Sequence, residues 1–182
     1  QDYSPNRLER AKLAISRMVD KLRDDRIGLI VFAGNSFVQL PLTTDYVSAK
    51  MFLSSISTES VPIQGTAMGE AISTALRSFS AQSDKSRAII VITDGENHED
   101  DPVAAARQAA ELGVRVFTIG VGSPQGTMIP MGDGQYLEDR EGNPVVTRLD
   151  DKVLQDVAEA GKGLYVHAGN REFGLDPIIE EI

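Results

Sequence analysis

The sequence predicts an α/β fold: a doubly wound, Rossmann-like, mostly parallel sheet with helices on both faces. Nearly continuous apolar runs, among them residues 26–34, 87–95 and 114–122, alternate with segments whose apolar residues recur every three or four positions. Continuous apolar runs are typical of parallel strands, because helices cover both faces of such a sheet. The alternation itself is typical of βαβ units. A length of 182 residues suits one domain with a sizeable core.

The first elements are a helix and two adjoining strands. Ser4 and Pro5 are expected to be an N-cap and a proline at the first helical position, with the helix reaching about residue 24. Its apolar face consists of Leu8, Ala11, Ile15, Val19 and Leu22. Segment 36–43 follows the strand at 26–34 too closely for a crossover. We therefore expect it to be an antiparallel edge strand, where Pro41 is tolerated.

The remaining elements follow the same alternation up to residue 122. Helices are predicted at 45–57, 67–80 and 102–112, with strands at 87–95 and 114–122 and a loop at 60–66. Between 124 and 149 the pattern changes to turn signals, Gly132-Asp133-Gly134 and Glu141-Gly142-Asn143, which indicate an inserted β-ribbon. A helix at 150–161, a strand at 163–169 and a C-terminal helix complete the expected domain.

Composition excludes several functional classes. The net charge of −9 disfavours nucleic acid as a partner. The chain has no cysteine, so thiolate metal sites are excluded. It has only two histidines, so a multi-histidine zinc site or a Ser-His-Asp triad has few candidate residues. We expect His98 to lie at the surface and His167 to be structural. No apolar stretch approaches the roughly 18 to 20 residues that span a bilayer.

Two segments carry polar groups to the carboxyl ends of predicted strands, where ligands bind in open parallel sheets. Thr66 follows Gly65 at the mouth of a helix, and Asp94 ends a buried strand, with Gly95 permitting a sharp turn after it. A hydroxyl and a carboxylate are hard oxygen ligands that suit Mg²⁺, Mn²⁺ or Ca²⁺. The sequence therefore predicts that Thr66 and Asp94 take part in a divalent cation site.

Structural explanations of the same residues stay open at this point. Thr66 could be only a helix N-cap, and Asp94 with Gly95 only a turn with a capping carboxylate. The acidic residues that follow are expected to form a solvated turn leading to the next helix rather than a ligand cluster; they are Glu96, Glu99, Asp100 and Asp101.

Nucleotide-binding and catalytic alternatives find less support. Glycines at 120, 122 and 126 miss the Gly-x-Gly-x-x-Gly spacing, and no Walker-type Gly-Lys-Ser/Thr occurs. A metal-dependent phosphohydrolase on a doubly wound sheet would use the Thr-Asp-Gly turn at 93–95 as its acidic corner. Such an enzyme needs an aspartate nucleophile at the end of its first strand, and this sequence offers none.

Five segments together resemble the von Willebrand factor A domain, in particular its bacterial Bat-type (aerotolerance) branch. They are "DYSPNRLERAKLAI" (2–15), "GTAMGEAI" (65–72), "RAIIVITDGENHED" (87–100), "REGNPVVTRL" (140–149) and "LDDKVLQDVAEAGKGLYVHA" (149–168). The resemblance covers essentially the whole chain. It implies a metal-ion-dependent adhesion site formed by an Asp-x-Ser-x-Ser turn after the first strand, a threonine and an aspartate. Thr66 and Asp94 match the last two, and a partner's carboxylate completes the shell, so the domain is no enzyme.

The Asp-x-Ser-x-Ser turn is where the sequence departs from the family. No strand precedes the first helix, and Asp2-Tyr3-Ser4-Pro5-Asn6 lacks the second serine. We therefore expect residues 1–182 to be one domain that is truncated at its N-terminus, with the remaining ligands upstream of residue 1 and weak or absent cation binding. In the family the first strand lies centrally, between 26–34 and 87–95. Its absence would leave two buried strands with unpaired backbone.

The resemblance also implies a role for the whole protein. Bat-type proteins are membrane-anchored, face the periplasm and are linked to stress or oxygen tolerance, so expected partners are other Bat proteins or a MoxR-type AAA+ ATPase. The ribbon at 124–149 is a candidate partner surface, or a cap on the sheet edge. The alternatives left open are the phosphohydrolase and a scaffold domain with a non-functional metal site.

Overall fold

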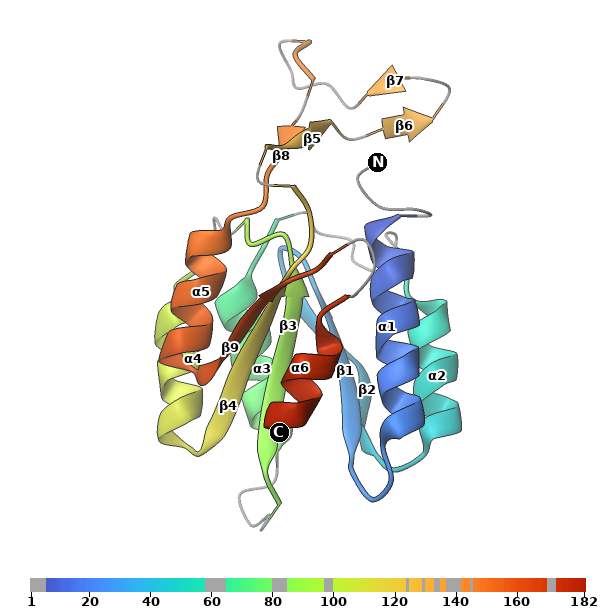
Figure 1. Ribbon diagram of the computed structural model, residues 1–182, viewed down its shortest axis with the longest axis vertical. Coiled ribbons are helices and arrows are strands. Elements are labelled where there is room, and N and C mark those ends of the chain that lie inside the picture. The colour runs from blue at the N-terminus through green and yellow to red at the C-terminus, as the bar shows by residue number, and fades with distance from the viewer. Residues whose placement is uncertain are drawn as a thin grey trace.

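The structure of the chain is a computed structural model, and it describes residues 6–57, 65–79, 85–96, 100–123, 125–128, 130–132, 135–136, 142–144, 146–169 and 173–182. Figure 1 shows strands between two layers of helices, with a small group of short strands beyond one edge. This arrangement confirms the predicted doubly wound α/β fold.

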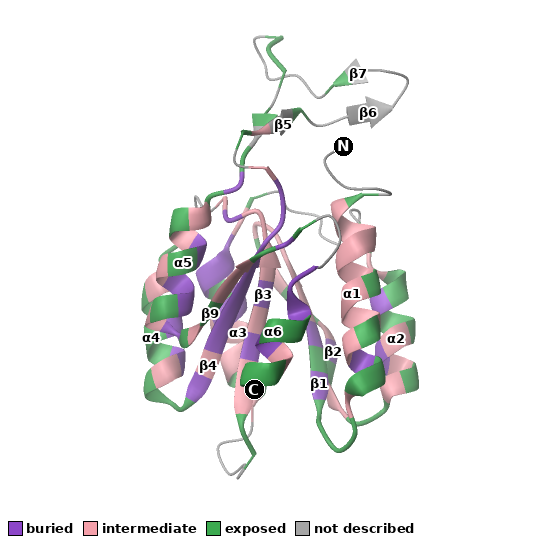
Figure 2. Ribbon diagram, in the orientation of Figure 1, coloured by how far each residue is buried: buried purple, intermediate pink, exposed green. Residues whose placement is uncertain are grey.

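Three parallel strands form the larger sheet, in the order β3-β4-β9. They are β3 (Arg87–Thr93), β4 (Val114–Gly120) and β9 (Lys162–His167). The β3–β4 register runs without interruption from Arg87 opposite Val114 to Thr93 opposite Gly120. Five consecutive residues of β4, from Val116 to Gly120, are buried, as expected for a central strand that is covered by helices on both faces (Figure 2).

Two antiparallel strands form a separate sheet: β1 (Ile27–Phe32) and β2 (Ser36–Thr43). The predicted edge hairpin is therefore confirmed, and Pro41 is exposed on the edge strand β2. The strand–helix alternation alone predicted one continuous sheet, whereas the family resemblance predicted unpaired backbone between 26–34 and 87–95. Among the described strands no backbone pairing joins β1 to β3, as the resemblance predicted. The side of β3 away from β4 and the side of β1 away from β2 thus have no strand partner in this part of the chain.

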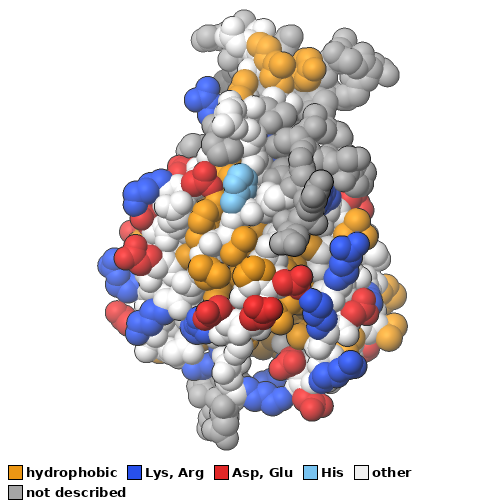
Figure 3. Space-filling model, viewed as in Figure 1, with side chains coloured by type: hydrophobic (Ala, Val, Ile, Leu, Met, Phe, Trp, Pro, Cys, Tyr) orange, Lys and Arg blue, Asp and Glu red, His pale blue; other side chains and the backbone are white. Residues whose placement is uncertain are grey.

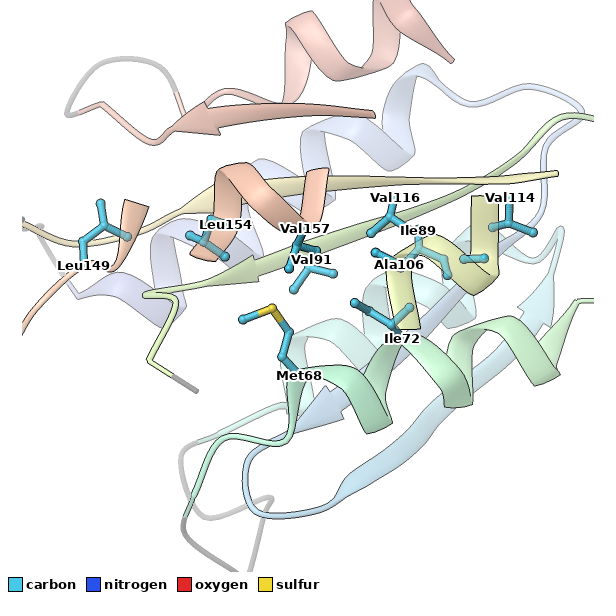
Figure 4. Packing of buried hydrophobic residues seen from close by; sticks show 11 residues of the cluster. Met68, Ile72, Ile89, Val91, Ala106, Val114, Val116, Leu149, Leu154 and Val157 are labelled. Carbon is cyan, nitrogen blue, oxygen red and sulfur yellow. The ribbon is translucent and has the colours of Figure 1, made fainter. Parts of the chain in front are cut away.

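One face of the larger sheet is covered by α3 (Met68–Ser78), α4 (Pro102–Glu111) and α5 (Asp151–Ala160). Met68 and Ile72 of α3 point toward Val91 of β3, and α4 and α5 contribute Ala106, Leu154 and Val157 to the same buried cluster (Figure 4). A buried polar residue in this region, Thr118, donates a hydrogen bond to the Leu154 carbonyl at 2.8 Å.

The opposite face is covered by α1 (Arg7–Lys21) and α6 (Leu175–Glu181), while α2 (Tyr46–Ser55) packs beside α1 against the sheet of β1 and β2. The predicted start of the first helix was wrong: the N-cap is Asn6, whose side chain accepts a hydrogen bond from the Glu9 amide at 2.8 Å. Asparagine is as good an N-cap as serine. Asn6 stands three residues before Glu9, and this is the spacing at which an N-cap side chain reaches a backbone amide of the first turn. Ser4 and Pro5 lie outside the described residues, and the helix ends at Lys21 rather than near residue 24.

In its described residues, the segment expected to form a ribbon contains four short strands: β5 (Thr127–Met128), β6 (Pro130–Gly132), β7 (Gln135–Tyr136) and β8 (Val146–Thr147). β5 pairs with β8 and β6 pairs with β7, both antiparallel. The pairs project beyond the edge at which β3 and β4 end (Figure 1). Among the described helices, none is long and apolar enough to cross a membrane.

Candidate metal site

The two predicted ligand-bearing segments lie at the same edge of the molecule, where β1 and β3 both end (Figure 1). Asp94 directly follows β3, and Thr66 lies two residues before α3. The amide of Ala67 donates a hydrogen bond to the carbonyl of Ala33, just after β1, at 2.7 Å. This bond fixes the turn that carries Thr66 beside the end of β1.

The turn after β3 holds Asp94 in a defined position. Its carbonyl accepts a hydrogen bond from the Asp150 amide at 2.8 Å, and its carboxylate Oδ1 accepts from the Glu96 amide at 3.4 Å. Gly95 has a φ of +80°, and a Cβ there would lie 2.6 Å from the Asp150 carbonyl oxygen, so both conformation and space require glycine. The sharp Thr-Asp-Gly turn is therefore as predicted, and its carboxylate keeps Oδ2 for other contacts.

The carboxylate of Asp94 is in an unfavourable environment for its own charge. Burial raises the pKa of Asp94 above its ordinary value, and the nearby Glu96 carboxylate raises that pKa further. Arg7 acts in the opposite direction, with Nη1 at 3.6 Å from Oδ2 of Asp94. The net shift of the Asp94 pKa is upward, so the protein's own groups do not fully compensate the negative charge of this carboxylate. A bound cation would compensate it.

Thr66 does not cap the helix that follows it. The N-cap of α3 is Ala67, which has no side-chain capping bond, and within the described part of the chain the Thr66 hydroxyl has no hydrogen-bond partner. The structural explanation of Thr66 as an N-cap is therefore wrong, and its hydroxyl is available for a ligand.

Asp100 caps α3 instead. Its Oδ1 accepts a hydrogen bond from the Gly69 amide at 3.0 Å, and its Oδ2 accepts one from the Glu70 amide at 2.7 Å. Sequence reasoning missed this role because 31 residues separate Asp100 from Gly69, and no local pattern reports such a contact.

The other acidic residues of this loop also have structural roles. Asp101 is the N-cap of α4 and accepts from the Ala104 amide at 3.0 Å. Glu96 is half-buried, and its Oε1 accepts from the Arg148 amide at 3.1 Å, so the expected solvated turn was wrong for Glu96. Asp100 and Asp101 are exposed as expected. Glu99 and His98 lie outside the described residues.

The donor set fits a hard divalent cation only in part. In the described part of the chain no group of three or more His, Cys, Asp or Glu side chains could hold a metal ion. His167 ends β9 with its Nε2 3.0 Å from the Gly122 carbonyl oxygen, in line with the structural role expected of it. One carboxylate, Asp94, and one hydroxyl, Thr66, are oxygen donors of the kind that Mg²⁺ prefers, but Mg²⁺ takes six ligands.

A pocket of about 160 Å³ opens beside Asp94, between α1 and the ends of β3 and β4. It is lined by Arg7, Leu8, Ala11, Ile92, Thr93, Asp94 and Val121. Most of these side chains are apolar, and the charged groups are Asp94 and Arg7. The pocket therefore adds no further anionic ligand to the site.

Comparison with known proteins identifies relatives across the whole chain. The profile of the von Willebrand factor type A domain family matches residues 1–132. BatB from Bacteroides thetaiotaomicron is 53% identical with a TM-score of 0.93, covering 100% of this chain and 90% of that one. An aerotolerance-related membrane protein from Bacteroides fragilis is 49% identical with a TM-score of 0.94 and the same coverage.

More distant relatives extend the comparison. A UPF0353 protein from Mycolicibacterium paratuberculosis is 33% identical over 183 residues, which cover 92% of this chain and 50% of the relative. The chain spans about half the length of the curated relatives it matches. Proximal thread matrix protein 1 from the mussel byssus, in a structure with a zinc-occupied adhesion-site motif, is 18% identical with a TM-score of 0.69 and shares the fold.

Proposed function

Because the chain belongs to the von Willebrand factor type A domain family, we propose that it is a non-catalytic domain that binds a protein partner through a divalent cation. The cation would lie at the edge where β1 and β3 end, with Thr66 and Asp94 among its ligands. One combined observation carries this proposal: two oxygen groups at the same edge lack full compensation by the protein. The Thr66 hydroxyl has no hydrogen-bond partner within the described residues, and burial raises the pKa of the Asp94 carboxylate. Burying the Asp94 carboxylate without full compensation is costly in a purely structural role.

The residues of this chain would perform distinct tasks in that site. Asp94 supplies the anionic ligand, and the Thr66 hydroxyl supplies a neutral one. The turn at Gly95 and the bond from the Asp150 amide to the Asp94 carbonyl fix the direction of the carboxylate. A bound Mg²⁺, Mn²⁺ or Ca²⁺ supplies a bridge to a carboxylate of the partner. Two donors from one chain make a weak site, so the remaining ligands are expected from sequence upstream of residue 1.

The length of the relatives supports a larger parent protein, because the chain spans about half of the curated relatives it matches. The Bacteroides fragilis relative is described as an aerotolerance-related membrane protein. By analogy, the parent of this chain is a BatB-like protein anchored in the membrane, with this domain facing the periplasm and a role in stress or oxygen tolerance. Its partners would be other Bat proteins or a MoxR-type AAA+ ATPase.

The ribbon is a second candidate element of the partner surface. Met128 and Val146 form a cross-strand pair, and both are exposed, as is Tyr136. Figure 3 shows hydrophobic side chains at the surface of this end of the molecule. The base of the ribbon is bonded to the loop of Asp94 through the Arg148 amide to Glu96 and the Asp150 amide to the Asp94 carbonyl. A partner that reaches the cation would therefore lie close to these apolar side chains.

The incomplete donor set favours one alternative, a scaffold domain whose metal site is non-functional. Nuclear magnetic resonance separates the two functions. In a chain extended upstream of residue 1, Mn²⁺ should broaden the amide signals of Thr66, Asp94 and Gly95 before others, and Asp94→Ala should abolish this. A Thr44→Val variant, which alters an exposed threonine, serves as the control. Uniform broadening, or none, would support the scaffold.

A further inference from the structure

We propose that Asp100 is a positioning residue for the cation site: it joins the helix that follows Thr66 to the start of α4 and so fixes the turn that carries Thr66. This inference rests on the proposed function. Both carboxylate oxygens of Asp100 are directed at α3, where they accept hydrogen bonds from two backbone amides, so its role is to position the helix rather than to act as a ligand. Its contribution is the placement of the segment that carries Thr66.

The geometry of the contact is that of an N-cap supplied from a distant part of the chain. Ala67 is the N-cap, so Gly69 and Glu70 are the second and third residues of α3, whose amides an N-cap side chain ordinarily satisfies. Asp100 accepts from both, at 3.0 and 2.7 Å. A negative charge at this end of a helix is also favoured by the helix dipole.

The Asp100 carboxylate in its observed position leaves no room for a side chain at residue 69. A Cβ there would lie 3.0 to 3.1 Å from the three carboxylate atoms of Asp100, closer than ordinary packing allows. Glycine is a poor helix former, yet Gly69 lies in the first turn of α3, where it is buried. The absence of a side chain therefore has a local reason, the close approach of the Asp100 carboxylate.

Thr66 is held between two anchors. On one side the Ala67 amide is bonded to the Ala33 carbonyl after β1, and on the other the first turn of α3 is bonded to Asp100. Asp100 lies two residues before α4. The Asp100 contact therefore ties the turn that carries Thr66 to the start of α4.

The competing explanation is that Asp100 only stabilises α3. The neighbouring Asp101 provides a matched control, because it caps α4 with a similar bond to the Ala104 amide at 3.0 Å, is also exposed, and carries the same charge. Its helix does not carry Thr66. A purely stabilising or long-range electrostatic role would make the two aspartates equivalent.

The test is Mn²⁺ titration by calorimetry on the chain extended upstream of residue 1, comparing wild type with Asp100→Ala, Asp101→Ala and Gly69→Ala. We expect Asp100→Ala to weaken Mn²⁺ binding on the order of 10- to 100-fold, as for other residues that orient metal ligands. Asp101→Ala should leave the affinity unchanged while lowering the melting temperature similarly. Gly69→Ala, which displaces the carboxylate without removing its charge, should also weaken binding.

Two results would overturn the proposal in distinguishable ways. Equal Mn²⁺ affinities for Asp100→Ala and Asp101→Ala, in a wild-type chain that binds, would show that Asp100 only caps a helix. No Mn²⁺ binding by the extended wild type would overturn the proposed function and this inference with it. Should Asp100→Ala fail to fold, the Gly69→Ala affinity decides alone, and an unchanged value contradicts the positioning role.

Discussion

Nη1 of Arg7, the first residue of α1, lies 3.6 Å from Oδ2 of Asp94, the residue that follows β3. The two side chains are 26% and 27% exposed, so water screens the pair only in part. Even with this cation nearby, burial and the Glu96 carboxylate keep the pKa of Asp94 above its ordinary value. The native state therefore holds a carboxylate at a cost in stability, which is common at functional sites.

We predict that Asp94→Asn stabilises the metal-free chain at neutral pH, by up to about 1 kcal/mol. Folding raises the pKa of Asp94, so the native state binds more protons than the unfolded state between the ordinary value of 3.8 and the raised value. The contribution of this group to stability is thus most favourable below pH 3.8 and declines as the pH rises through that window. Urea denaturation at several pH values should show the gain of the variant disappearing in acid.

Asp45→Asn is the control of opposite sign. Hydrogen bonds from the Ser48 hydroxyl and amide lower the pKa of Asp45, so its stabilising effect is present at neutral pH and is lost as the pH falls through the lowered pKa. The asparagine variant should therefore be less stable than wild type at neutral pH. If Asp94→Asn is also destabilising there, the carboxylate of Asp94 contributes to folding and the argument from its pKa fails.

Gly69→Ala and Asp100→Ala should be strongly non-additive. Alone, Gly69→Ala pushes the Asp100 carboxylate away and costs about 1 kcal/mol, since the loss of two amide bonds outweighs the better helix propensity of alanine. In the Asp100→Ala background the same change should be neutral or stabilising by up to about 1 kcal/mol. A double-mutant cycle from urea denaturation measures the coupling, and additive effects would mean that the two residues do not interact.

Lys162→Gly should stabilise the protein by about 0.5–1 kcal/mol, because Lys162 has a φ of +54° at the start of β9 and left-handed backbone is costly for residues with a Cβ. The bond from Arg115 Nε to the Lys162 carbonyl, at 3.1 Å, is made by the backbone and remains. Lys162→Ala is the matched control and should be close to wild type in thermal denaturation. Equal stabilisation by alanine would place the effect in the side chain.

Local patterns predicted most of the elements. The apolar runs at 87–95 and 114–122 contain β3 and β4. Each predicted strand extends past the end of the observed strand into the turn that follows; after β3 these extra residues are Asp94 and Gly95. The rule that carboxyl ends of strands gather ligands also placed Thr66 and Asp94 at one edge. Their role as ligands stays a prediction.

Contacts between distant residues could not be predicted in the same way. The cap of α3 by Asp100 crosses from one loop to another, and the approach of Arg7 to Asp94 joins the first helix to the end of β3. Periodicity and capping signals report only neighbours within about four residues. The lack of pairing between β1 and β3 was likewise expected from the family resemblance and not from local patterns, which carry no information on strand order.

Mg²⁺ and Mn²⁺ titration by calorimetry, on residues 1–182 and on the chain extended upstream of residue 1, tests the central claim most directly. The proposed cation site predicts clear binding by the longer chain, loss of that binding in Asp94→Ala and Thr66→Val, and weak or no binding by residues 1–182. Binding by the longer chain that survives Asp94→Ala, or no binding by either chain, would contradict a cation site built on Thr66 and Asp94.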